Sequence, residues 1–177
     1  DVTLFSAGAD DSTPLRQRMR AAAEHFVDLH GLGLPQMAAA IRERDIDILV
    51  DVKGATYGSV MQVMAHRPAP LQVNWLGFPG TSGAEYVDYV IGDPLLTPLE
   101  HAPWFSEKIA QMPFSYQPND SRRLRPPPSR RADWGAPDDA VLLAAFHQSY
   151  KISEPVFDAW CRILHTVPQA VLWLLRW

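Results

Sequence analysis

The sequence contains a single cysteine, and this scarcity excludes several kinds of protein. Cys161 alone cannot form a disulfide framework or a zinc site made of several thiolates. The 6 histidines show no H-E-x-x-H or comparable spacing, so no metal site is predicted. One thiol in 177 residues fits a reducing compartment, and we expect a cytoplasmic protein.

Long apolar runs and a strong net charge are also lacking. Apolar stretches such as Val141–Phe146 and Ala170–Leu175 are far shorter than the about 20 residues of a membrane-spanning helix. No signal peptide pattern follows Asp1. The formal net charge of −4 provides no global attraction to nucleic acids or membranes. We therefore expect no membrane partner and do not favour a nucleic acid.

Several catalytic signatures are missing as well. The glycines match neither the Walker loop nor G-x-G-x-x-G, and no G-x-S-x-G elbow is present. Cys161 is expected on the buried face or edge of a helix, where it cannot act as a nucleophile. The scattered aspartates form no carboxylate pair for glycoside hydrolysis.

The first two thirds of the chain alternate between short strand and helix patterns. This order predicts an α/β fold with a parallel sheet and helices on both faces. Thr13 is placed to cap the first helix, whose Leu15, Met19, Ala22 and Ala23 share an apolar face. The predicted strands are Val2–Ser6, Phe26–Leu29, Ile46–Val52, Leu71–Leu76, Asp88–Ile91 and Lys108–Gln111, and the predicted helices are Ser12–Glu24, Leu34–Arg44 and Tyr57–His66.

The segment between Pro118 and Pro137 has no apolar periodicity. It carries five arginines and a run of prolines, without interleaved aromatic residues. One interpretation is a nucleic-acid or phosphate patch. The favoured interpretation is a stiff, solvated connector between domains. The arginines are Arg122, Arg123, Arg125, Arg130 and Arg131.

A second strand–helix–strand unit follows the connector. It comprises Val141–Phe146, a helix capped by Ser153 and running to about His165, and Ala170–Leu175. Both strands are apolar at nearly every position, so coverage on both faces is expected. Two strands do not finish a domain, and Ala170–Trp177 resembles a buried strand that is cut short. We expect the chain to be a piece of a longer protein.

Three segments are expected at the carboxyl ends of strands, where open α/β sheets bind ligands: Asp51–Gly58, Leu76–Gly83 and His147–Lys151. Lys151 lies just before a helix N-terminus, a position suited to a phosphate group. Gln148 offers a donor and an acceptor to the amide edge of a nucleobase. The alternative is an ordinary solvent-facing lysine and a loop glutamine. The glycine-containing loop at residues 77–83 is, on its own, weak evidence for a ligand site.

Three strings together go beyond these local patterns. Arg67–Gly83, Phe146–Ile152 and Val167–Arg176, in this order, closely resemble the catalytic region of the O-linked N-acetylglucosamine (O-GlcNAc) transferases, bacterial members in particular. The resemblance implies a GT-B-like fold, in which two Rossmann-type domains with parallel sheets face each other, usually behind a tetratricopeptide array. Residues 1–118 would be the C-terminal part of the first, acceptor-side catalytic domain. Residues 119–137 would be the connector, and 138–177 the start of the UDP-sugar-binding domain.

The resemblance also implies roles for individual residues. Gln148 matches a glutamine at the uracil-nucleotide site, and Lys151 matches a lysine at the diphosphate that activity requires. Leu76, Gly77 and Pro79 match a loop near the sugar and the acceptor. Ala55 and Tyr57 depart from the Tyr and Lys of animal members, so contacts with the acceptor are expected to differ. The family's proposed basic histidine and its later diphosphate-binding loop cannot be assigned in these residues.

The expected reaction is transfer of N-acetylglucosamine from UDP-GlcNAc to Ser or Thr hydroxyls of proteins, with no cofactor and no metal. The expected partners are a UDP-sugar and a protein or peptide acceptor. One alternative is a related transferase with another donor, such as GDP-fucose for O-fucosylation or UDP-glucose for asparagine glucosylation. Another is a non-catalytic nucleotide-binding scaffold module that has kept the fold.

Overall fold

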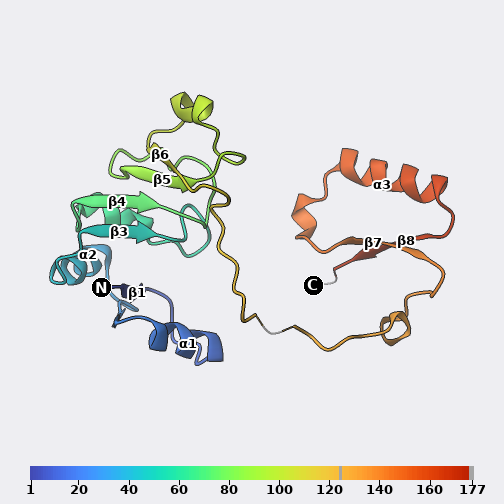
Figure 1. Cartoon of the computed structure of the whole chain (residues 1–177), viewed down its shortest axis with the longest axis horizontal. Coiled ribbons are helices and arrows are strands. Elements are labelled where there is room, and N and C mark those ends of the chain that lie inside the picture. Colours follow the sequence, from blue (N-terminus) through green and yellow to red (C-terminus); the bar gives the residue numbers. More distant parts are fainter. Residues whose placement is uncertain (124, 176–177) are drawn as a thin grey trace. The chain divides into compact units, whose positions relative to one another are not determined.

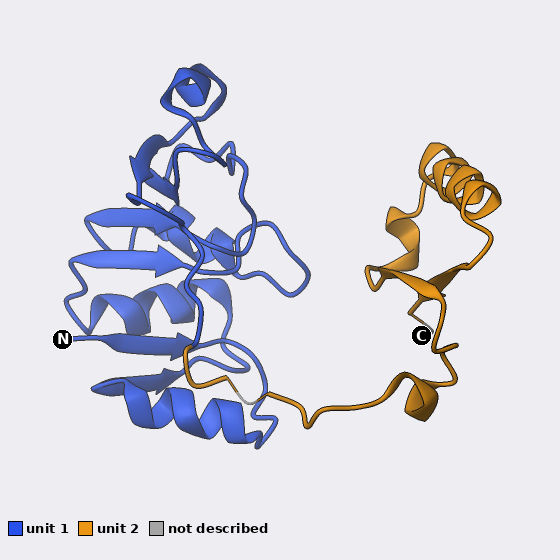
Figure 2. Ribbon diagram, turned by 45° about the vertical axis from the view of Figure 1, so that its right-hand side comes forward, with its two compact units in different colours: residues 1–120 blue, residues 121–177 orange. Residues whose placement is uncertain are grey.

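The computed structural model describes residues 1–123 and 125–175. The chain forms two compact units, residues 1–120 and 121–177 (Figures 1 and 2). Both units are α/β, and every strand pair in them is parallel, as the sequence predicts. We describe each unit by itself.

Unit 1 holds two hydrogen-bonded sheets, and the prediction of one continuous sheet is wrong for the described residues. The smaller sheet pairs β1 (Thr3–Ser6) with β2 (His25–Asp28). The larger sheet has the order β3-β4-β5-β6. Its strands are β3 (Ile48–Asp51), β4 (Leu71–Asn74), β5 (Tyr89–Gly92) and β6 (Lys108–Gln111). The two sheets are separate because no described strand pairs with both β1 and β3.

One apolar core lies under both sheets of unit 1. Helix α2 (Leu34–Arg42) and the 3₁₀ helix η1 (Met61–His66) supply half of its buried residues. The helix predicted over Tyr57–His66 is shorter in the structure, because Tyr57 and Gly58 form a turn in which Gly58 has φ +70°. A second 3₁₀ helix, η2 (Leu99–Trp104), was not predicted. The buried core residues are Leu29, Met37, Ala38, Ile41, Leu49, Val63, Met64, Ala69, Ala84 and Val87.

Helix α1 (Pro14–Ala22) confirms the predicted start but not the predicted inner face. The Thr13 side chain accepts a hydrogen bond from Arg16 N at 3.2 Å, as an N-cap residue should. Leu15 and Met19, however, are 62% and 50% exposed. The helix instead packs through its cations, since the guanidinium groups of Arg16 and Arg20 lie 5.5 and 5.2 Å from the centre of the Phe26 ring. Leu15 and Met19 are thereby left in solvent.

Unit 2 is a single parallel strand pair with one helix. Strands β7 (Val141–Ala145) and β8 (Ala170–Leu174) are joined through the 3₁₀ turn η4 (Ser149–Lys151) and helix α3 (Glu154–Thr166). Val141 and Leu174 are 44% and 41% exposed, so coverage of both faces, predicted from the apolar strands, is wrong for the described residues. Residues 176 and 177 of the predicted last strand lie outside the described residues.

The arginine-rich segment contains local structure that the sequence did not reveal. Residues Arg131–Trp134 form the 3₁₀ helix η3. Arg131 Nη1 donates to the carbonyls of Pro137, Asp138 and Ala140, at 3.3, 3.3 and 2.5 Å, and Arg130 forms an ion pair with Asp133. Arg130 and Arg131 therefore act within the fold, which favours the connector over a nucleic-acid patch.

Candidate functional site

The loop that follows β3 begins with a carboxylate that binds the backbone of the same loop. Asp51, the last residue of β3, accepts hydrogen bonds from Gly54 N at 2.6 Å and from Lys53 N at 3.4 Å. The Thr56 hydroxyl donates to Lys53 O at 2.9 Å. These bonds turn residues 51–56 back over the carboxyl end of the sheet, which is where parallel sheets bind ligands.

Glycine brings this loop against the loop that follows β4. A Cβ atom on Gly77 would lie 2.2 Å from Lys53 O, so only glycine fits there without movement of the backbone. A Cβ atom on Gly54 would lie 3.0 Å from Phe78 Cβ and 3.3 Å from Asn74 Oδ1. The predicted segments Asp51–Gly58 and Leu76–Gly83 are therefore in direct contact.

Leu76 opens the second loop in an unusual backbone conformation. Its φ is +77°, in the left-handed region that non-glycine residues rarely adopt. Its side chain is half-buried, whereas Gly77 and Pro79 are exposed. The structure thus places Leu76, Gly77 and Pro79 together at the rim of unit 1. Nothing in the sequence signalled the conformation of Leu76, because leucine gives no local cue for it.

Glu107 binds the far end of the same loop, at residues 81 and 82, through hydrogen bonds. The carboxylate is 4% exposed and accepts hydrogen bonds from Thr81 Oγ1 at 2.7 Å, from Ser82 N at 2.7 Å and from Ser82 Oγ. Burial alone would raise the pKa of Glu107, but the hydrogen bonds from Ser82 and Thr81 outweigh it and hold the pKa below its usual value. Sequence reasoning missed Glu107, since it is distant in sequence from the loop.

Asn74 is a second residue that sequence reasoning missed. It ends β4, pairs in register with Asp51, and is 1% exposed. Neither its Nδ2 nor its Oδ1 has a hydrogen-bond partner among the described residues. A buried amide without a partner is costly, so it is suited to a water molecule or a polar group that enters between the two loops.

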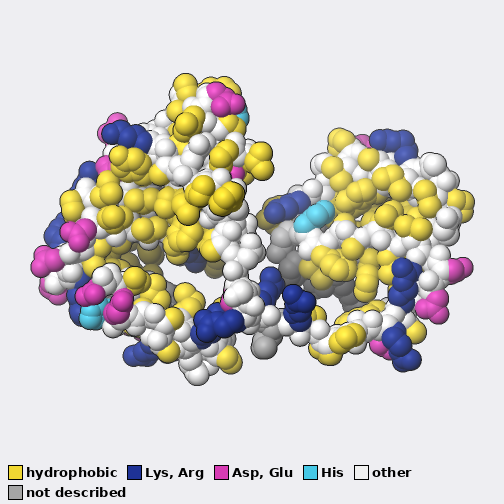
Figure 3. Space-filling model, in the orientation of Figure 1, with side chains coloured by type: hydrophobic (Ala, Val, Ile, Leu, Met, Phe, Trp, Pro, Cys, Tyr) yellow, Lys and Arg dark blue, Asp and Glu magenta, His cyan; other side chains and the backbone are white. Residues whose placement is uncertain are grey.

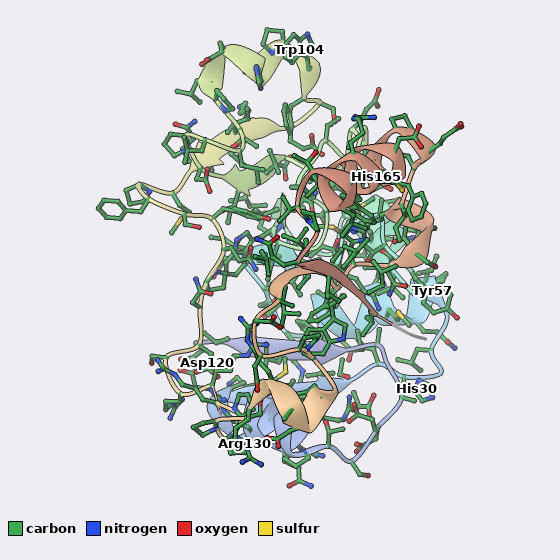
Figure 4. All side chains as sticks on the ribbon, turned by 90° about the vertical axis from the view of Figure 1, so that its right-hand side faces the viewer. His30, Tyr57, Trp104, Asp120, Arg130 and His165 are labelled. Atoms are coloured by element: carbon green, nitrogen blue, oxygen red, sulfur yellow. The ribbon has the colours of Figure 1, made fainter. Side chains whose placement is uncertain are left out.

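Residue 57, labelled in Figure 4, is a fully exposed tyrosine on the first loop.

In unit 2, Gln148 and Lys151 belong to one turn. Lys151 N donates to Gln148 O at 3.0 Å and closes the 3₁₀ turn η4. Both side chains are exposed, and Lys151 forms no ion pair with any described residue. His147 stacks on Trp160 of α3, with 5.8 Å between the ring centres, which ties the turn to the helix. The lysine is therefore held near α3 with its charge uncompensated.

The N-terminus of α3 differs from the prediction in one respect. Ser153 is the N-cap residue, but its side chain accepts no hydrogen bond. Pro155 removes one of the two N–H groups that a capping hydroxyl can bind, and the other, Val156 N, forms no such bond. The first turn of α3 therefore begins without a side-chain cap, next to Lys151 in sequence.

Residues 1–123 and 125–175 show neither a metal-binding cluster nor a membrane-spanning helix. No group of three or more His, Cys, Asp or Glu side chains in these ranges could hold a metal ion. In the same ranges, no helix has the length and apolar character needed to cross a membrane.

The family model for glycosyl transferase family 41 matches residues 1–127 and 119–177, which together cover the chain. A probable UDP-N-acetylglucosamine–peptide N-acetylglucosaminyltransferase of Arabidopsis thaliana, SEC, is 38% identical over 99% of the chain and 19% of its own length. The UDP-N-acetylglucosamine–peptide N-acetylglucosaminyltransferase of Caenorhabditis elegans is 38% identical over 70% of the chain and 11% of its length.

Among solved structures, a mutant of the O-GlcNAc transferase of Thermobaculum terrenum matches with a TM-score of 0.82 and 28% identity. The match covers 98% of the chain and 32% of that protein. These matches confirm the expected fold class, which is α/β and GT-B-like with parallel sheets. The chain spans about a fifth of the length of the Arabidopsis relative.

Proposed function

The chain belongs to glycosyl transferase family 41, and on this premise we propose that the protein containing it transfers N-acetylglucosamine from UDP-GlcNAc to Ser or Thr hydroxyls of proteins. The acceptor is a protein or peptide, and the donor is a UDP-sugar. The names of the Arabidopsis and Caenorhabditis relatives support both partners. The cytoplasmic location expected from the sequence belongs to the same proposal.

The main structural support for this proposal is the turn that contains Gln148 and Lys151. In the reaction, the acceptor oxygen bonds to C1 of the sugar, the bond between C1 and the β-phosphate oxygen breaks, and UDP leaves with the electron pair. Negative charge therefore grows on the β-phosphate. Lys151 is exposed, makes no ion pair with a described residue, and precedes a helix N-terminus that favours anions.

Lys151 is the proposed catalytic residue, because its ammonium stabilises the charge of the leaving diphosphate. A donor that acts at a developing charge contributes about 3 kcal/mol to the lowering of the barrier. Gln148 begins the turn that ends at Lys151, and its amide is the group proposed to bind the edge of the uracil. No metal or other cofactor is part of this proposal. The acceptor hydroxyl also loses a proton, and we assign no residue of this chain to accept it.

On unit 1, the proposal assigns Leu76, Gly77 and Pro79 to contacts with the sugar and the acceptor. The backbone contact between Gly77 and Lys53 supports this role, because it fixes the loop before a substrate arrives. The buried amide of Asn74 adds a hydrogen-bonding group behind the loop. The exposed Tyr57, at a position where animal members carry Lys, marks a surface where contacts with the acceptor are expected to differ.

The test uses the full-length protein and three donors. UDP-GlcNAc, UDP-glucose and GDP-fucose are compared for the rise in melting temperature, which follows binding to the folded state. Each donor is then assayed for transfer to a panel of Ser/Thr peptides. We expect UDP-GlcNAc to stabilise the protein and to support transfer. If only GDP-fucose or only UDP-glucose stabilises the protein and supports transfer, the protein is a related transferase with that donor. If a donor binds but is neither transferred nor hydrolysed, the result favours a scaffold module.

A further inference from the structure

An exposed group of apolar side chains lies on the loops that follow β5 and β6. Leu95 and Phe114 are 90% and 89% exposed, and Leu96 and Met112 are 42% and 43% exposed. Figure 3 shows hydrophobic side chains over β5, β6 and the loops at their carboxyl ends. Together these four residues form the apolar patch. Apolar side chains that gather on a surface mark an interaction site, whereas scattered ones do not.

The carboxylate of Asp93 holds the two loops of the apolar patch together. It is 6% exposed, and its Oδ1 accepts hydrogen bonds from Leu95 N and Leu96 N at 3.0 and 2.8 Å. Its Oδ2 accepts a third hydrogen bond from Tyr116 N, two residues after Phe114, at 3.0 Å. Because one buried carboxylate binds both loops, their backbones are brought to one place and fixed before a partner binds. Such preorganisation lowers the entropic cost of association.

The apolar patch is continuous with the candidate site of unit 1. Trp75 Nε1 donates a hydrogen bond to Tyr116 O at 2.8 Å, so the loop after β6 is bound to the residue that precedes Leu76. Strands β4, β5 and β6 are parallel neighbours, and their carboxyl ends therefore meet at one edge of the sheet. A ligand that contacts Leu76 at this edge thus lies next to the loops of the apolar patch.

The composition of these loops indicates the chemistry of the partner. Residues 94–99 and 112–118 include no lysine, arginine, aspartate or glutamate. The core of a protein–protein interface is likewise depleted of charge and enriched in phenylalanine and methionine. Nucleic acids and phosphate ligands bind through cations and hydrogen-bond donors, and the side chains of Leu95 and Phe114 offer neither. The partner that suits the apolar patch is therefore a polypeptide with exposed apolar side chains.

We propose that the apolar patch is a docking surface for the protein acceptor. It binds apolar side chains of the acceptor outside the modified Ser or Thr, while the loop at residues 76–79 contacts the region of the reacting hydroxyl. Phe114 is the main contact, because burial of a large exposed ring removes the most apolar area from water. This inference rests on the proposed function, since that function is what requires a protein acceptor.

Acceptor kinetics with the full-length protein test the docking surface. One peptide carries leucine and phenylalanine on both sides of a single Thr, and a matched peptide carries glutamine at those positions. The double variant Leu95→Ser/Phe114→Ser removes the two most exposed members of the patch, and Leu15→Ser is the control, since Leu15 is a 62% exposed residue of α1. We expect the double variant to raise KM for the apolar peptide at least about 10-fold. Its kcat, its KM for UDP-GlcNAc and its KM for the glutamine peptide should match those of the wild type and of Leu15→Ser.

The same assays separate failure of the docking surface from failure of the proposed function. Equal KM values of the double variant and the wild type for the apolar peptide, with transfer by both, would overturn the docking surface alone. No transfer by the wild type to any peptide would overturn the proposed function and this inference with it. Self-association, or binding to phosphatidylcholine vesicles, that the double variant abolishes would identify another occupant and also overturn the inference.

Single variants of Phe114 distinguish apolar contact from a fault in folding. Phe114→Leu keeps an apolar side chain at this position and should retain a lower KM for the apolar peptide than Phe114→Ser does. Both variants should unfold at the temperature of the wild type, because the side chain is 89% exposed. Equal KM values for Phe114→Leu and Phe114→Ser, both raised above the wild type, would contradict apolar docking at this residue.

Discussion

The loops of unit 1 and the turn of unit 2 prepare a site in opposite ways. In unit 1, positions are fixed by backbone contacts: Gly77 lies against Lys53 O, and Glu107 binds the Thr81–Gly83 segment through hydrogen bonds. In unit 2, Gln148 and Lys151 share one short turn, and their side chains are exposed. In the proposed function, the first region supplies shape and the second supplies charge. Changes in unit 1 should therefore affect stability, and changes in unit 2 should affect the reaction.

The sharpest test of this difference is Lys151→Ala in the full-length protein. If the Lys151 charge acts on the departing diphosphate, as proposed, its loss should lower kcat by about 100-fold to 1000-fold with little change in unfolding free energy. Arg162→Ala is the matched control, because it removes an exposed cation from the adjacent helix α3. Steady-state kinetics with UDP-GlcNAc and denaturant unfolding measure the two quantities. Equal kcat values for Lys151→Ala and the wild type would show that unit 2 does not supply the charge.

In unit 1, Gly77→Ala should act mainly on stability. The new Cβ would overlap the Lys53 carbonyl, and the backbone would have to move, at a cost of about 1–3 kcal/mol in unfolding free energy. Gly8→Ala is the control, since no atom lies within 4 Å of the Cβ position there. Denaturant unfolding of both variants measures the difference. A Gly77→Ala protein as stable as the control would mean that the two loops are not held by backbone contact.

The carboxylate of Glu107 predicts how the stability of unit 1 depends on pH. Its pKa in the folded protein lies below the usual 4.5, so ionised Glu107 contributes stability above that value and loses the contribution as pH falls through the folded pKa. Glu107→Gln should therefore be less stable than the wild type at pH 7, and the difference should shrink below about pH 4.5. Unfolding at a series of pH values measures it. A difference that is constant with pH would contradict the assignment.

The smallest expected effects concern the two helix caps. Thr13→Ala removes a side-chain hydrogen bond at the start of α1 and should lower unfolding free energy by about 1 kcal/mol. Ser153→Ala removes no such bond from α3 and should stay within about 0.5 kcal/mol of the wild type. Thermal unfolding of both variants provides the comparison. Equal losses would indicate that Ser153 caps α3 after all.

Much of the fold could be predicted because it depends on local patterns. Runs such as Lys108–Gln111 and Val141–Phe146 predicted strands that the structure confirms as β6 and β7. Alternation of strands and helices predicted the parallel pairing. The predicted inner face of α1 was wrong because Arg16 and Arg20, not Leu15 and Met19, pack against β2. Apolar spacing alone does not show which face of a helix finds a partner.

The residues of the candidate site also differ in whether the sequence could reveal them. Gln148 and Lys151 could be selected from the sequence, because their chemistry and their place before a helix are local properties. Glu107 and Asn74 could not, because their importance depends on contacts with residues 81–82 and on burial behind Gly54. The assigned roles of Gln148, Lys151, Leu76, Gly77 and Pro79, and the boundaries at residues 118 and 138, stay predictions.

The left-handed conformation of Leu76 has a consequence for protein engineering. A non-glycine residue at φ +77° is less favourable by about 1–2 kcal/mol, and Leu76→Gly would relieve that cost. Loss of the half-buried side chain opposes this gain, so the backbone and the side chain of residue 76 make competing demands at the rim of the candidate site. If the leucine side chain contacts the substrate, as proposed, a variant with the relaxed backbone will be the poorer enzyme. Selection for turnover should then keep a residue that the backbone conformation alone would disfavour.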